Sequence, residues 1–213
     1  MPCRTMELCL GASILKRTQP DPAVESALVE RCKRQDAEAF GKIVDAYQNR
    51  VYGFVRRMIR DNDEAADITQ EVFIRAYQAF IRFDGRSSLR TWLFRIAHNL
   101  CVDRVRKHDR MPTEFHLDNG SEEDGPMDVA DSRWDPQHLV LDDELRKVVE
   151  TAIANMSEKL RSVLLLHDQE DLAYDEIAQA LDLPIGTVKS RLFLARNHLQ
   201  TVLSPYLKGE VSQ

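Results

Sequence analysis

The 213-residue sequence predicts an all-α protein made of two small helical domains. Three observations support this prediction. Apolar residues recur at intervals of three and four along residues 25–110 and again along residues 138–207, which is the spacing of amphipathic helices. Residues 111–137 between them are rich in proline, glycine and acidic residues and cannot form a core. A chain of this length can bury two small cores, so we expect each periodic segment to fold as a domain.

Residues 25–110 are expected to contain three strong helices. Their apolar stripes consist of Phe40, Ile43, Val44, Tyr47, Val51, Phe54, Val55 and Met58 in the first, Ile68, Val72, Phe73, Ala76, Tyr77 and Phe80 in the second, and Leu89, Trp92, Leu93, Ile96, Ala97, Leu100 and Cys101 in the third. Acidic residues at 61–64 suit the start of the second helix, because they complement its positive end. Residues 84–88 predict a turn at Gly85 and a serine cap for the third helix.

Residues 111–137 are predicted to be a flexible acidic linker. Pro112, Pro126 and Pro136 interrupt any helix, and eight acidic residues stand against the single base Arg133. Such a segment repels itself and stays extended. Residues 1–24 are interpreted as a disordered N-terminal extension and residues 208–213 as a short tail.

Residues 138–207 predict a second helical domain that ends in a helix-turn-helix. A helix capped by Ser157 precedes two helices joined at Leu183-Pro-Ile-Gly, because Pro lacks a backbone donor and Gly tolerates unusual dihedral angles. Thr187 or Gly186 is expected to cap the second of these helices, which should end near residue 203, before Pro205. Its apolar residues Val188, Leu192 and Ala195 are expected to face inward. A second helix of this kind is shaped to enter the major groove of DNA.

The overall composition limits the kinds of function. The formal net charge is −6, although a protein that binds DNA alone usually carries a basic excess for the phosphates. This balance favours a subunit that receives help in holding DNA. The four cysteines lack the spacing of metal ligands and fit a reducing, cytoplasmic setting. No apolar run is long enough for a membrane span, and no residue constellation indicates catalysis, a metal or a cofactor.

Three sequence motifs identify a family resemblance. They are Asp-Ile-Thr-Gln-Glu-Val-Phe at residues 67–73, Phe-Asp-Gly-Arg-Ser-Ser-Leu-Arg-Thr-Trp-Leu-Phe-Arg-Ile-Ala at 83–97, and Gly-Thr-Val-Lys-Ser-Arg-Leu at 186–192. In this order and spacing, the chain resembles a bacterial RNA polymerase sigma factor of the extracytoplasmic-function (ECF) group. The resemblance implies a sigma-2-like bundle at 25–110 and a sigma-4-like domain at 138–207. It also implies two partners, core RNA polymerase and promoter DNA, and makes an anti-sigma factor an expected third.

The resemblance assigns polymerase docking to the second helix of the first domain. The implied contact residues are Asp67, Gln70, Glu71 and Phe73. Asp67, Gln70 and Glu71 lie three and four residues apart, so they share one face of the helix. An acidic, hydrogen-bonding face suits a basic partner helix.

The resemblance assigns recognition and melting of the −10 element to the loop at 84–88 and the helix that follows. The implied DNA contacts are Arg86, Ser87, Ser88, Arg90, Arg95, Arg104, Arg106 and Lys107. Single-stranded bases need aromatic platforms and positive charge. Phe83, Trp92 and Phe94 offer rings, although the position of Trp92 in an apolar stripe favours a core role.

The resemblance assigns the −35 element to the last long helix. The implied contacts are Thr187, Lys189, Ser190, Arg191 and Arg196. Lys189, Ser190 and Arg191 lie early enough in this helix to reach base edges, and arginine can bind a guanine with two hydrogen bonds. Arg196 lies further along and suits a phosphate. Phe193-Leu194 departs from the polar residues common in the family.

Two alternatives remain open at this level. An autonomous helix-turn-helix regulator would bind duplex DNA tightly without polymerase. A polymerase-binding decoy would bind polymerase without starting transcription. The acidic balance argues against the first, and the intact Lys189-Ser190-Arg191 helix argues against the second.

Overall fold

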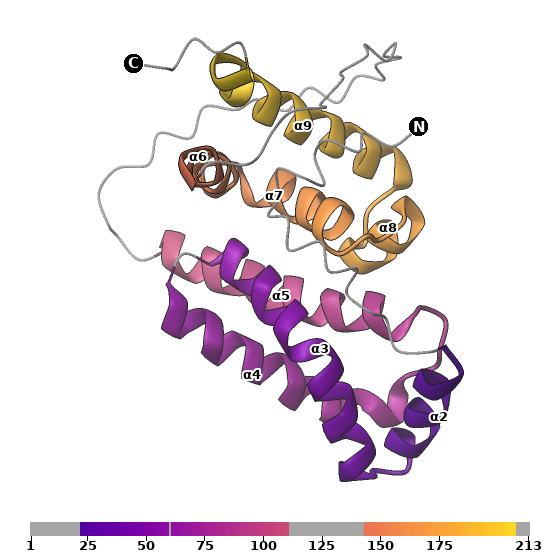
Figure 1. Ribbon diagram of the computed structural model, residues 1–213. Helices are drawn as coiled ribbons and strands as arrows, with labels where there is room; N and C mark the ends of the chain where they lie inside the picture. The colour runs from indigo at the N-terminus through magenta and orange to yellow at the C-terminus, as the bar shows by residue number, and fades with distance from the viewer. Residues whose placement is uncertain (1–21, 60, 111–142, 208–213) are drawn as a thin grey trace.

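The computed structural model describes residues 22–59, 61–110 and 143–207, and all secondary structure within these residues is helical. The first group of helices is α2 (Pro22–Lys33), α3 (Ala37–Met58), α4 (Asn62–Ala79), the short 3-10 helix η1 (Phe80–Arg82) and α5 (Leu89–Arg110). The second is α6 (Asp143–Ala154), α7 (Glu158–Leu164), the π-helical turn η2 (Leu165–Gln169), α8 (Tyr174–Leu181) and α9 (Ile185–Leu207). The two groups form two bundles, one above the other in Figure 1. The all-α prediction is confirmed.

Side-chain caps fix where the helices of the first bundle begin. The Asp36 carboxylate accepts a hydrogen bond from the Ala39 amide at 3.1 Å, and Asp61 caps α4 in the same way. Ser88 Oγ accepts from the Thr91 amide at 3.1 Å, which confirms the predicted serine cap of α5. These bonds satisfy amides that have no partner inside the helix.

The core of the first bundle is formed largely by the predicted stripes, although Tyr77 of the second stripe is exposed. Phe54 of α3 and Phe94 of α5 are fully buried, and their ring centroids lie 5.4 Å apart in an edge-on arrangement. Trp92 is partly buried against Phe80 and Phe83, so its core assignment is confirmed. Phe83 and Phe94 are 6% and 0% exposed, so the expectation that they offer rings to bases is wrong for this conformation. Apolar burial holds these rings in the core.

The helix-turn-helix of the second bundle differs from the prediction at both ends of its long helix. Helix α8 ends at Leu181, and the next residue, Asp182, caps it in a left-handed conformation with a φ of 56°. Helix α9 already begins at Ile185, and the Pro184 carbonyl accepts a hydrogen bond from the Val188 amide at 3.2 Å. Thr187 therefore lies inside the first turn and is not the cap. The helix also continues through Pro205, whose missing amide removes one hydrogen bond near the end of the helix.

The inward face of α9 and the start of α7 agree with the prediction in part. Val188, Leu192 and Ala195 are buried, as expected. Helix α7 begins directly after Ser157, but the Ser157 side chain makes no capping hydrogen bond. The π-helical turn η2, which follows α7 and buries Leu165 and Leu166, was not predicted from the sequence.

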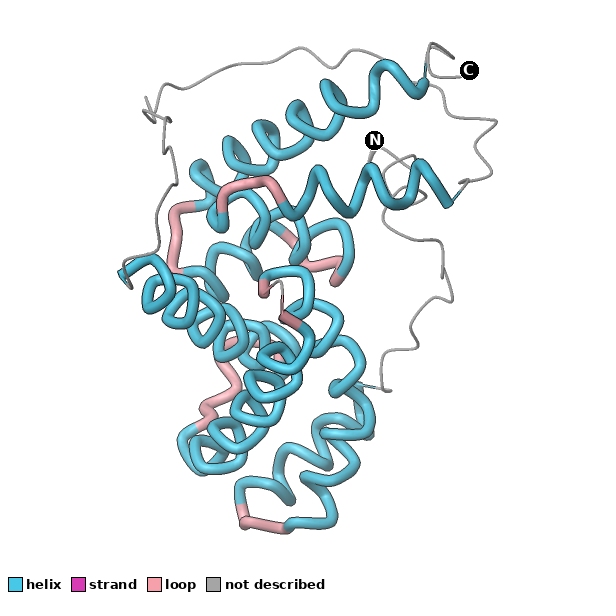
Figure 2. Tube along the Cα trace, turned by 90° about the vertical axis from the view of Figure 1, so that its left-hand side faces the viewer, coloured by secondary structure: helices cyan, strands magenta, loops and turns pink. Residues whose placement is uncertain are grey.

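The two bundles pack against each other (Figure 2). Their buried apolar residues form one hydrophobic core. Helix α8 lies against α5, while α6, α7 and η2 lie against α3. The predicted acidic linker at 111–137 and the tail at 208–213 lie outside the described residues. The N-terminal extension was expected to reach residue 24, whereas α2 begins at Pro22.

Candidate nucleic-acid and polymerase interfaces

The polar residues of the predicted docking face on α4 reach the surface of the protein. Asp67 and Gln70 are exposed, and Glu71 is half-buried with its Oε1 2.7 Å from Arg75 Nε. Phe73 is only 8% exposed and belongs to the core, so its inclusion among the surface contacts is a correction. The helical spacing of 3.6 residues turns Phe73 into the core and away from this face. The face itself consists of Asp67, Gln70 and Glu71.

The predicted −10 surface begins at the loop before α5. Gly85 has a φ of 74°, a left-handed conformation that glycine adopts without steric cost. This turn presents Arg86 to solvent, where its Nε lies 3.0 Å from Asp84 Oδ2. Ser87 is half-buried and Ser88 is exposed.

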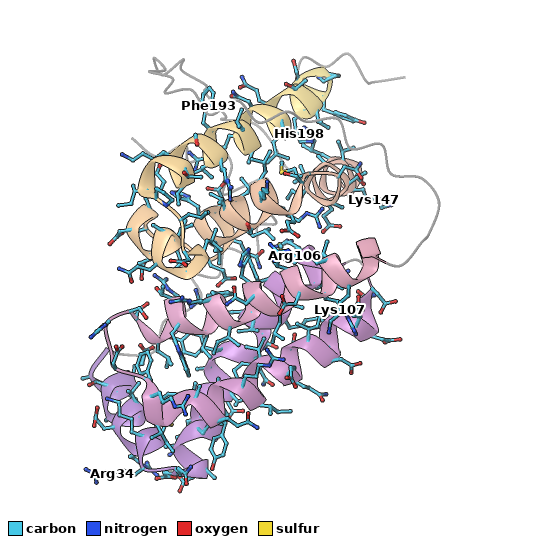
Figure 3. All side chains as sticks on the ribbon, turned by 180° about the vertical axis from the view of Figure 1, so that it is seen from behind. Arg34, Arg106, Lys107, Lys147, Phe193 and His198 are labelled. Atoms are coloured by element: carbon cyan, nitrogen blue, oxygen red, sulfur yellow. The ribbon has the colours of Figure 1, made fainter. Side chains whose placement is uncertain are left out.

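The basic residues further along α5 differ in their exposure to solvent. Arg95, Arg106 and Lys107 are exposed, and Figure 3 labels the last two near the end of the helix. Arg104 is half-buried, and its Nε lies 2.5 Å from Glu64 Oε1 on α4. Three of these four predicted contacts are therefore presented to solvent, and Arg104 holds two helices of its own bundle together.

Two of the predicted −10 residues, the half-buried Arg90 and the exposed Ser88, contact the second bundle. The Arg90 Nη2 group donates to Glu176 Oε2 at 3.0 Å, and Ser88 Oγ donates to Glu176 Oε1 at 3.1 Å. Thr91 Oγ1 donates to the same Oε1 at 3.1 Å. Burial alone raises the pKa of Glu176, but the Ala173 amide and the Arg90 guanidinium outweigh this effect and hold that pKa below its ordinary value. Glu176 is therefore a carboxylate that is held ionised.

A second ionic contact between the bundles is fully enclosed. Arg50 Nε of α3 donates to Glu170 Oε2 at 2.8 Å, and the Glu170 side chain has no solvent exposure. The Glu170 carbonyl accepts from Arg50 Nη2 at 3.3 Å and from Arg90 Nη1 at 3.2 Å. Arg57 of α3 also donates to Gln169 of η2. One short segment, residues 169–176, thus provides most of the polar contacts to the first bundle.

The start of α9 presents most of the predicted −35 residues. Lys189 and Ser190 are exposed, and Thr187 and Arg191 are half-buried. Arg196 does not share this surface, because its Nη2 donates to Asp168 Oδ1 at 2.7 Å. The ion pair joins α9 to η2, so the predicted phosphate contact of Arg196 is replaced here by a contact within the bundle.

His98 on α5 lies close enough to Arg106 and Arg191 for their charges to affect its pKa. Burial is the main cause that lowers the pKa of His98 to about 4; a hydrogen bond with Asn99 opposes the shift, and the nearby charges of Arg106 and Arg191 add to it. Its Nδ1 atom is buried and has no hydrogen-bond partner among the described residues. The side chain is therefore neutral near pH 7. Nothing in the sequence singled out His98.

Sequence reasoning missed Arg50, Glu170 and Glu176. Glu176 stands three residues after Ala173, and its carboxylate accepts the Ala173 amide at 3.0 Å, so an N-terminal position on α8 was visible in the sequence. Nothing in a single sequence indicates that Arg50 pairs with a residue 120 positions away.

Neither a metal cluster nor a membrane span is found in the part of the chain that the structure describes. No group of three or more His, Cys, Asp or Glu side chains in residues 22–59, 61–110 and 143–207 is arranged to hold a metal ion. No helix among these residues is both long and apolar enough to cross a membrane.

Comparisons with known proteins identify both bundles. The family models for Sigma-70 region 2 and Sigma-70, region 4 match residues 43–111 and 146–199. The RNA polymerase sigma-H factor of Pseudomonas aeruginosa is 36% identical over 186 residues, which cover 86% of this chain and 96% of the relative. The ECF RNA polymerase sigma-E factor of Escherichia coli K12 is 35% identical over 188 residues, with coverage of 86% and 96%. The chain belongs to the ECF sigma factors of the sigma-70 family.

Two solved structures support the fold of this sigma factor. CnrH, solved in complex with the cytosolic domain of CnrY, aligns with a TM-score of 0.61 at 22% identity and covers 85% of this chain and 97% of that one. The sigma factor RpoE of Bartonella quintana, solved with the anti-sigma factor NepR, aligns with a TM-score of 0.58 at 24% identity, covering 78% and 96%. Family membership favours an initiation factor over both alternatives raised from the sequence.

Proposed function

We propose that this ECF sigma factor binds core RNA polymerase through α4 and reads two promoter elements, one with each bundle. The observation that carries the proposal is the exposed Lys189 and Ser190 at the start of a helix-turn-helix, together with a separate basic surface on α5. Two reading surfaces in one chain suit two DNA elements. A free-standing regulator has no need of the second surface.

The polymerase contact is assigned to Asp67, Gln70 and Glu71. Asp67 and Gln70 lie exposed on one face of α4, and Glu71 lies beside them with a partner, Arg75, one helical turn away. A face of this kind fits a basic helix of the polymerase and steers the approach of the two proteins.

The −10 element is assigned to the loop and basic face of the first bundle, and the −35 element to α9. Arg86 and Arg95 offer positive charge, and Ser87 and Ser88 offer hydroxyl groups to an unpaired base. Lys189, Ser190 and Arg191 lie in the first two turns of α9, the part of a recognition helix that reaches base edges. Thr187 lies in its first turn and suits a phosphate.

The sigma factor supplies binding energy and no bond-making chemistry of its own. Unpaired bases that stack and form hydrogen bonds on the protein offset the cost of opening the duplex. We also assign the protein to the cytoplasm, where polymerase works, and expect an anti-sigma factor as its regulator. Both similar solved structures are complexes, one of them with a protein named an anti-sigma factor.

Transcription in vitro tests this function directly. The purified chain is added to bacterial core polymerase and fragmented genomic DNA, and the 5′ ends of the transcripts are mapped by sequencing. We expect discrete starts that share two upstream elements and that are absent without the protein. Polymerase binding without starts would favour the decoy, and duplex binding without polymerase binding would favour the free-standing regulator.

A further inference from the structure

We propose that Leu194 is a specificity-determining residue of the −35 reading surface and selects thymine through contact with the C5-methyl group of that base. The proposal rests on the proposed function, in which α9 enters the major groove at the −35 element. It adds an apolar contact to the hydrogen-bonding residues Lys189, Ser190 and Arg191. In the sequence, Leu194 stood out only as part of a departure from the polar residues common in the family.

Leu194 lies on the outward face of α9. Its side chain is 52% exposed, although leucine is usually buried. The buried stripe of the helix consists of Val188, Leu192, Ala195 and Leu199. An α-helix turns by about 100° per residue, so Leu194 lies about 40° from Ser190 and on the side opposite the buried stripe. The core of the bundle therefore gains little from this leucine, whereas a ligand on the outward face would contact it directly.

The surroundings of Leu194 favour DNA as that ligand. Residues 185–207 contain no acidic side chain, which suits a helix that lies between two rows of phosphates. The other exposed large apolar side chain of α9 is Ile185, which lies about 140° away from Ser190 around the helix. Phe193, next to Leu194, is half-buried. Protein interfaces have a broader apolar centre, whereas one exposed leucine among polar and basic side chains matches a single methyl group.

The major groove offers one apolar group to such a side chain. Among the base edges that line this groove, only thymine presents a methyl group, and the others present hydrogen-bond donors and acceptors. Ser190 Oγ donates to the Thr187 carbonyl at 3.1 Å, so this hydroxyl presents its acceptor side to DNA. Leu194 follows Ser190 by one helical turn, a rise of about 6 Å, and bases stack at about 3.4 Å. The selected thymine should therefore lie about two base pairs from the base that Ser190 reaches.

Transcription by the full-length chain with core polymerase tests this contact on synthetic copies of a mapped promoter. In each copy, one thymine of the −35 element is replaced by deoxyuridine, which removes the methyl group and keeps the base pair. A further copy carries an unrelated sequence in place of the whole −35 element. The variants are Leu194→Ala and Leu194→Met, because methionine keeps an apolar contact of similar size. Val24→Ala is the matched control, since Val24 is an apolar residue of α2 that is 54% exposed.

We expect one deoxyuridine replacement to reduce transcription by the wild-type chain by about 3- to 5-fold, the effect of burying one methyl group. Leu194→Ala should reduce transcription from the unmodified promoter by about 3- to 10-fold and should lose nothing further at that replacement. Leu194→Met should keep the difference between thymine and deoxyuridine, and Val24→Ala should behave like the wild-type chain. Binding to core polymerase should be equal for all four proteins.

Three results would overturn this inference and leave the proposed function intact. The first is a wild-type chain that responds to replacement of the whole −35 element but to no single deoxyuridine. The second is Leu194→Ala that still distinguishes thymine from deoxyuridine, which would assign the methyl contact to another residue. The third is weaker polymerase binding by Leu194→Ala with unchanged discrimination, which would make Leu194 a protein contact.

A different result would contradict the proposed function itself. If the wild-type chain transcribed equally well after replacement of the whole −35 element, α9 would not read that element. The inference about Leu194 would then fail with the assignment on which it rests.

Discussion

Arg50 and Glu170, which are 120 residues apart in the sequence, form an ion pair at 2.8 Å in the interior of the protein. Arg50 belongs to α3 and Glu170 follows η2, so each bundle supplies one charge. Removing either partner would leave the other charge uncompensated, whereas separating the bundles returns both charges to water. The pair therefore specifies how the bundles meet and need not add much to stability.

Substitution by alanine should have opposite effects on the stability of the protein at Gly85 and at Gly41. Gly85→Ala should destabilise the protein by about 1 kcal/mol, because alanine pays a steric cost at a φ of 74°. Gly41→Ala should stabilise it by about 0.5–1 kcal/mol, because Gly41 lies inside α3 with no atom within 4 Å of an added methyl group. Urea unfolding of both variants measures this difference. Equal effects of the same sign would contradict the assigned conformation of Gly85.

The lowered pKa of His98 should make the protein less stable as the pH falls. Its pKa is about 4 in the folded chain against an ordinary value of 6.5, so the unfolded chain binds the proton first. The free energy of unfolding should therefore fall by roughly 1–2 kcal/mol between pH 6.5 and about pH 5.

Urea unfolding at several pH values measures the contribution of His98, with His98→Asn as the comparison. The variant should lose less stability than the wild-type chain across this window. Glu176 does not interfere, because its lowered pKa confines its loss of stability to pH values below its ordinary range. Parallel pH profiles for the two proteins would contradict the burial of a neutral His98.

Asp67→Lys should weaken binding to core polymerase by about 10-fold or more, because a reversed charge repels a basic partner. A competition assay against a labelled sigma factor measures the change. Asp45→Lys is the charge-matched control, since Asp45 is exposed on α3, outside the α4 face. Equal weakening by both variants would show a general effect of net charge.

Arg191→Ala should reduce transcription from a mapped promoter by about 5- to 100-fold, if the arginine binds a guanine through two hydrogen bonds. The loss should be greatest for promoters with the preferred base at one position of the −35 element, and polymerase binding should not change. Equal losses on all −35 sequences would reassign Arg191 to a phosphate.

The sequence predicted the helices and their inward faces well because both depend on local spacing. Val188, Leu192 and Ala195 are buried because they recur at the helical period, and the Ser88 cap follows from a short-range preference. The wrong assignment of Phe73 also has a local cause. Phe73 was placed on the docking face by its motif, although its position in the apolar stripe of α4 indicated the core.

The contacts between the bundles could not be predicted from one sequence. The sequence analysis did not single out Arg50, Glu170 or Glu176, and it assigned Arg90 to DNA. Their pairing depends on the packing of two bundles, and no periodicity or motif encodes it. The ion pair between Arg196 and Asp168 could not be predicted either, because it depends on the π-helical turn η2, which the sequence did not reveal.

The partial exposure of the Arg90–Glu176 pair has a consequence for experiments at different ionic strengths. Salt weakens the attraction between a protein and phosphates, and it also screens an ion pair that water can reach. Added salt should therefore release Arg90 from Glu176 while it reduces the affinity of Arg90 for DNA. The two effects oppose each other, so strand binding by the free chain should depend less steeply on salt than its number of phosphate contacts implies.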